Sequence, residues 1–71
     1  MRKTIRLLKW IDKDLAEGII KTAELYGEEM GNNPEIAEEI GEANDELIKA
    51  QKSVTKALDI LSQIYNECYD D

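Results

Sequence analysis

The sequence predicts an all-α fold, a coiled-coil-like antiparallel hairpin of two helices that dimerises into a four-helix bundle. Three observations predict it. Apolar residues recur at alternating four- and three-residue spacing, a single short stretch has the composition of a turn, and strand-like alternation of apolar and polar residues is absent. A chain of 71 residues is one small domain, which we assign to residues 1–71.

The segment "MGNNPE" contains the predicted turn. Gly31 suits the left-handed conformation that ends many helices, and Asn33 is a favourable N-cap before a proline at the first position of the next helix. We therefore expect a first helix over about residues 4–30, a turn over 31–33 and a second helix over about 34–69.

The second helix has an apolar residue at each a and d position of a heptad repeat. One of its two rows repeats alanine, at Ala43, Ala50 and Ala57, which we interpret as the place where large side chains of the first helix pack closely. From the position of the turn, residues that face each other should have numbers that sum to about 65. The predicted helix–helix seam consists of Leu8, Leu15, Ile19, Tyr26, Ile40, Ala43, Leu47, Ala50, Val54, Ala57, Leu61 and Ile64.

Further apolar residues lie outside this seam, because two helices cannot enclose all of their apolar surface. Trp10 is the only tryptophan, and exposed tryptophan is a common interface anchor. The alternative is that Trp10 lies over lysine stems at the end of the hairpin. The candidate partner or dimer interface is Leu7, Trp10, Leu25, Ile48, Ile60 and Tyr65.

The net charge of −7 is unevenly distributed. Residues 1–13 carry five positive charges and one negative charge, whereas residues 14–46 carry eleven negative charges and one positive charge. Two hairpins packed antiparallel would place the basic end of each beside the acidic end of the other. The candidate basic end is Arg2, Arg6, Lys9, Lys13, Lys52 and Lys56, and the candidate acidic binding face is Glu24, Glu28, Glu29, Glu35, Glu38, Glu39, Glu42, Asp45 and Glu46.

The residue types argue against an enzyme. The chain has no histidine and one cysteine, Cys68, so a zinc site, a disulfide and a histidine-activated nucleophile are not expected. We predict no catalytic residue, no metal and no cofactor. One cysteine also favours a reducing compartment, and charged residues interrupt every apolar run, so we expect a cytoplasmic protein without a membrane span.

One carboxylate pattern requires separate treatment. An EExxE motif is formed by Glu38, Glu39 and Glu42, and an ExxD motif is formed further along the chain by Glu67 and Asp70. This pair of motifs resembles the magnesium-binding motif pair of all-α nucleoside triphosphate pyrophosphohydrolases. In that family the two motifs face each other from separate helices, whereas here both lie on one predicted helix, about 37 Å apart at about 1.5 Å per residue. We therefore interpret the first cluster as a solvated acidic face.

These observations favour a non-enzymatic helical protein–protein interaction module, a small homodimeric regulator or inhibitor that binds and blocks another protein, of the phage or mobile-element accessory type. Two alternatives stay open. The acidic residues are typical of a nucleic-acid mimic that occupies a DNA- or RNA-binding groove of a defence or nucleic-acid enzyme. The basic end would suit RNA or an anionic membrane surface.

Overall fold

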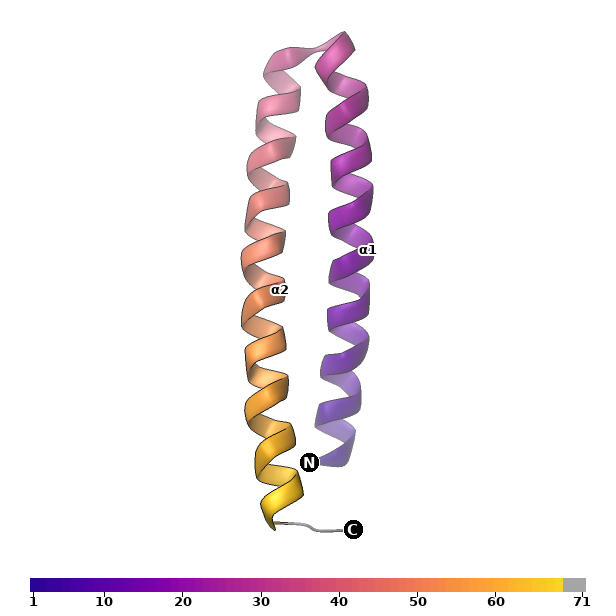
Figure 1. The fold of residues 1–71 in the computed structure, drawn as a ribbon. Coiled ribbons are helices and arrows are strands. Elements are labelled where there is room, and N and C mark those ends of the chain that lie inside the picture. The colour runs from indigo at the N-terminus through magenta and orange to yellow at the C-terminus, as the bar shows by residue number, and fades with distance from the viewer. Residues whose placement is uncertain (69–71) are drawn as a thin grey trace.

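The computed structural model describes residues 1–68 and contains two long helices that pack antiparallel along their length (Figure 1). Helix α1 spans Arg2–Asn32 and helix α2 spans Pro34–Cys68. The hairpin is a thin rod with Cα extents of 54 × 14 × 11 Å, and the described residues contain no strand. The prediction of an all-helical fold with two packed helices is confirmed. Tyr69, the expected last residue of the second helix, and Asp70 lie outside the described residues.

The turn is shorter than expected, because a single residue, Asn33, separates the two helices. A residue before proline is restricted to extended backbone, and Asn33 has φ −149° and ψ 89°. Its carbonyl oxygen accepts from the Ala37 N–H at 3.0 Å, and its Oδ1 accepts from the Ile36 N–H at 3.5 Å, as expected of an N-cap. The expected left-handed Gly31 is wrong: no glycine within residues 1–68 has a positive φ, and Gly31 stays helical.

The two helices pack close to the predicted register. Thr55 Oγ1 donates to Asp12 Oδ1 at 3.2 Å, and these residue numbers sum to 67. Nearer the turn, Asn44 Nδ2 donates to the Ile19 carbonyl oxygen at 2.9 Å, and these numbers sum to 63. Both sums lie within two of the expected value of about 65, so the position of the turn correctly predicted which residues of the two helices lie side by side.

The rotation of α2 about its own axis differs from the prediction. The row of large residues lies in the seam as expected, with all four half-buried: Ile40, Leu47, Val54 and Leu61. The assignment of Ala43 and Ala50 to the seam is wrong, because both are exposed, whereas Ala57, further along the same row, is half-buried. At the ends of this row, Ile36 and Ile64 are also exposed. The second row of the seam is instead Ala37, Asn44, Gln51, Leu58 and Tyr65.

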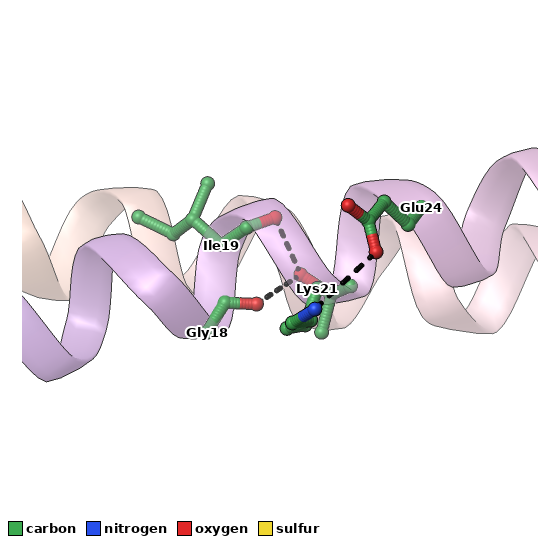
Figure 2. A network of polar contacts seen from close by, with 5 residues as sticks. Gly18, Ile19, Lys21 and Glu24 are labelled. Atoms are coloured by element: carbon green, nitrogen blue, oxygen red, sulfur yellow. Dashed lines mark hydrogen bonds and ion pairs between the residues drawn. The ribbon is translucent and has the colours of Figure 1, made fainter.

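A polar contact accounts for this rotation. Thr22 Oγ1 donates to the carbonyl oxygens of Gly18 at 2.9 Å and Ile19 at 3.1 Å, and Figure 2 shows these two oxygens directed at one hydroxyl group. Asn44 Nδ2 donates to the same hydroxyl oxygen at 2.5 Å as well as to Ile19. These bonds hold Asn44 against α1, and Ala43, the preceding residue of the helix, is thereby turned outward. One polar residue in a seam is a known determinant of register.

A close approach near the turn favours the same rotation. Tyr26 lies over Gly41 so closely that a β-carbon at Gly41 would be 3.2 Å from the Tyr26 Cε2 atom. With alanine at this position the Tyr26 ring would have to shift by a few tenths of an ångström.

The resulting core is thin. Ala37 is the only buried residue among those that the structure describes, and the seam residues of α1 are at most half-buried. The hairpin alone therefore buries little apolar surface.

Two helical glycines of α1 and one of α2 provide a test of the packing near the turn. Gly27→Ala and Gly31→Ala should each raise the free energy of unfolding by about 0.5–1 kcal/mol, because alanine is the better helix former and the added methyl group meets no atom within 4 Å. Urea denaturation measures this. In Gly41→Ala the same gain should be reduced by contact with Tyr26, so an equal gain at Gly41 would contradict the close packing of that ring.

Candidate functional site

The hairpin has two broad faces, one on each side of the seam. On the first, the contacts Thr55–Asp12 and Gly41–Tyr26 link the two helices, and shallow hollows there are lined by residues of both. We call it the polar face; its flanking rows are Arg2, Lys9, Ala16, Ala23 and Met30 of α1 and Gly41, Ile48, Thr55 and Ser62 of α2.

Heptad spacing then assigns the remaining flanking rows to the opposite side. We call this side the alanine face; it consists of Leu7, Ile11, Gly18 and Leu25 of α1 and Ile36, Ala43, Ala50, Ala57, Ile60 and Ile64 of α2. Gly18 lies on this face close to α2, because a β-carbon added at Gly18 would be 4.0 Å from Leu47 Cδ1.

The alanine face has small side chains in the middle. Its six large aliphatic residues are 38–56% exposed and lie toward the two ends of the rod, whereas Gly18, Ala43 and Ala50 lie between them. The two rows next to the seam contain no charged side chain, whereas the outer rows of Leu7 and Ile60 also contain Asp14, Lys21, Glu39 and Glu46. The face is therefore an apolar strip with a charged border, which is suited to packing against another helix pair.

The structure brings together three of the six residues of the predicted interface. Leu7, Leu25 and Ile60 all lie on the alanine face. Ile48 and Tyr65 do not: both are half-buried, and the Tyr65 hydroxyl oxygen accepts from Arg2 Nε at 3.1 Å and Arg2 Nη2 at 2.8 Å. The alanine face also includes the exposed Ile11, Ile36 and Ile64. The predicted interface did not include them, because Ile64 was assigned to the seam and Ile11 and Ile36 to neither surface.

Trp10 lies on the side of α1 that points away from α2. It is 64% exposed, and the hollow beside it is lined only by residues of α1: Lys13, Asp14 and Glu17. Its ring is therefore separate from the alanine face.

The predicted acidic residues surround the turn half of the rod and do not form one face. Glu38, Glu42 and Asp45 line a shallow groove on the polar face beside Tyr26, and Glu39 and Glu46 lie on the other side of α2. Glu29 is half-buried and the other eight are exposed: Glu24, Glu28, Glu35, Glu38, Glu39, Glu42, Asp45 and Glu46. Two take part in exposed ion pairs, Lys21–Glu24 at 3.7 Å (Figure 2) and Lys49–Glu46 at 3.3 Å, which contribute little to stability.

The predicted basic residues lie toward the other end of the rod. Arg2, Arg6 and Lys9 line a shallow hollow with Ile5, and the Arg2 guanidinium lies 5.8 Å from the Tyr65 ring centroid. The other three are exposed: Lys13, Lys52 and Lys56. In the folded rod, therefore, the basic residues gather at one end and the acidic residues gather at the turn.

Two further properties concern the chemistry. Among residues 1–68, no three acidic, cysteine or histidine side chains are arranged to hold a metal ion. Glu38, Glu39, Glu42 and Glu67 all lie on α2, and Asp70 lies outside the described residues. Neither helix, over the part that the structure describes, has an apolar stretch of the length needed to cross a membrane.

Comparison of the chain with protein-family models finds no match, and comparisons with curated proteins and with solved structures find none either.

Proposed function

We propose that the chain is a non-enzymatic helical interaction protein, which dimerises into a four-helix bundle and binds and blocks another protein. The observation that carries this proposal is the ratio of exposed to buried apolar residues. Eleven large hydrophobic residues are exposed, whereas a single residue of the described chain, Ala37, is buried.

The accessible surface supports association. The hairpin exposes 5590 Å², whereas a compact monomer of 8.1 kDa exposes about 4,500 Å². The larger surface is that of a thin rod, which leaves apolar side chains exposed on both sides of its seam. Small domains without a disulfide or a metal often gain their stability from such self-association.

Trp10 supports a further partner. It lies away from the alanine face, so it stays accessible when that face is covered, and tryptophan is enriched among residues that dominate binding energy. A small, strongly acidic bundle with one exposed indole on each subunit would suit a regulator or inhibitor of the phage or mobile-element accessory type.

Sedimentation velocity tests the assembly. We expect a species of about twice 8.1 kDa at micromolar concentration, and a monomer throughout that range would contradict it. Affinity purification from the native cell with mass spectrometry tests the second partner. Trp10→Ala should lose a captured protein that wild type and Ile20→Ala retain, since Ile20 is a similarly exposed residue of α1.

The nucleic-acid mimic is a second candidate, favoured by the groove in which Glu38, Glu42 and Asp45 surround Tyr26. Acidic residues on all sides of the turn half of a thin rod would suit a positively charged groove. A mimic should compete with DNA or RNA for its target, and its affinity should fall steeply as salt rises. The basic-end alternative has less support, because Arg2 is engaged by Tyr65.

A further inference from the structure

The rows of the alanine face have a twofold pattern. Along α2 the row reads Ile36, Ala43, Ala50, Ala57, Ile64, which is the same in both directions about Ala50. Along α1 the matching row reads Thr4, Ile11, Gly18, Leu25, Asn32, with a glycine at its centre, a large aliphatic residue on each side and a polar residue at each end.

The two centres lie at the same level of the rod. Gly18 and Ala50 have numbers that sum to 68, close to the sums of 67 and 63 for the pairs that contact across the hairpin. A single axis that is perpendicular to both helices and parallel to the alanine face can therefore pass beside both residues. An interface between identical subunits related by a twofold axis must be self-complementary about that axis, and both rows meet this condition.

We infer that a second copy of this chain covers the alanine face in one orientation, with the twofold axis passing beside both Gly18 and Ala50 and the two turns at opposite ends. This inference rests on the proposed self-association and specifies its geometry. Helix α2 then packs antiparallel on α2 of the second copy, and α1 packs on α1. The small residues at the centre allow the helices to approach closely, because interaxial distance depends on the side chains at the contact.

The pairing that this axis dictates is complementary in the rows next to the seam, whereas in the outer rows Leu7 would lie by Glu28 and Ile60 by Glu39 of the other copy. Residues of α2 whose numbers sum to about 100 meet across the interface, so Ala50 meets Ala50, Ala43 meets Ala57 and Ile36 meets Ile64. Residues of α1 whose numbers sum to about 35 meet, so Ile11 lies by Leu25 and Asp14 lies by Lys21 of the other copy.

Charge complementarity selects this orientation over the one in which both turns lie at the same end. The five positive charges of residues 1–13 come beside the acidic turn half of the other copy, whereas turns at one end would gather both acidic halves. The alanine repeat thus belongs to contact between hairpins, and this explains why a row with coiled-coil spacing lies exposed on the single chain.

Disulfide trapping in a Cys68→Ser background tests the axis. Ala50→Cys should form a covalent dimer at least about tenfold faster than Ala23→Cys, because only at the axis would two identical positions come within disulfide distance. Ala23 is the matched control, an exposed alanine on the polar face. A mixture of Ala43→Cys with affinity-tagged Ala57→Cys should give mainly the mixed disulfide, whereas each variant alone should give little.

The outcomes separate the axis from self-association itself. If wild type sediments as a dimer but Ala50→Cys reacts no faster than Ala23→Cys, the axis is wrong and the dimer stands. A mixed disulfide between Ala50→Cys and Gly18→Cys would overturn the orientation, because it requires both turns at one end. A monomeric wild type would overturn both the axis and the proposed bundle.

Discussion

Ala37→Asp should lower the free energy of unfolding by about 2–4 kcal/mol, one of the two largest single-residue effects that we expect in this protein. Ala37 is 0% exposed and faces α1 from the first turns of α2. A carboxylate at this position would lose its hydration without a cationic partner, or would force the helices apart next to the turn. Urea denaturation monitored by circular dichroism at one fixed protein concentration measures the change.

Ala23→Asp is the matched control for this substitution. Ala23 is an exposed alanine in the interior of α1, so the variant has the same loss of helix propensity, about half a kcal/mol, without burial. The interaction of a carboxylate with the positive end of α2 would slightly favour the aspartate at Ala37, so it cannot produce the loss. Equal losses in the two variants would mean that the turn end is open to water.

The contrast between Ala37 and Ala43 shows what could be predicted from this sequence. Heptad spacing identified the large row of α2, and the single pre-proline asparagine identified the turn, so the hairpin and its register followed directly. Two rows flank the large row, however, one with three alanines and one with Asn44 and Gln51. The row with three alanines is the more apolar of the two, so heptad spacing alone favours it as part of the seam. The structure uses the other row, because Asn44 forms side-chain hydrogen bonds to α1 that cannot be predicted from the spacing of apolar residues.

The same misplacement explains the incomplete prediction of the candidate site. Once Ala43, Ala50 and Ile64 were assigned to the seam, the apolar residues left for a partner were scattered over the surface. A rotation of α2 by a fraction of a turn joins them with Leu7 and Leu25 into one continuous face. The signal was present in the sequence, because a row of alanines between polar neighbours marks a close helix contact without specifying which helix makes it.

The contact that sets this rotation gives the second large prediction. Asn44→Asp should lower the free energy of unfolding at neutral pH by about 1–3 kcal/mol, although the two side chains have the same shape. In the wild type the amide group donates to the Ile19 carbonyl oxygen, which only accepts. A carboxylate in its place would put two acceptors in contact, and the Thr22 hydroxyl could relieve this only by giving up its bonds to Gly18 and Ile19.

The loss in Asn44→Asp should depend on pH. The neutral carboxyl group has a hydroxyl that donates to Ile19, so folding favours the protonated form and the pKa of the introduced group is higher in the folded state than its unfolded value of about 3.9. A group whose pKa is raised by folding contributes stability below the unfolded pKa and loses it as pH rises through the folded pKa. The difference between wild type and variant should therefore be smallest below about pH 4 and should grow toward neutrality.

Denaturation of both proteins across this pH range measures the difference, and Asn66→Asp is the control. Asn66 is an exposed asparagine of the same helix, so its substitution should change stability by less than about 0.5 kcal/mol at any pH in the range. If the two variants had the same pH profile, the amide of Asn44 would not hold α2 in its observed rotation. The outward position of Ala43 and Ala50 would then depend on the close packing of Tyr26 over Gly41, because no other hydrogen bond of the described chain joins α1 and α2 in the turn half of the rod.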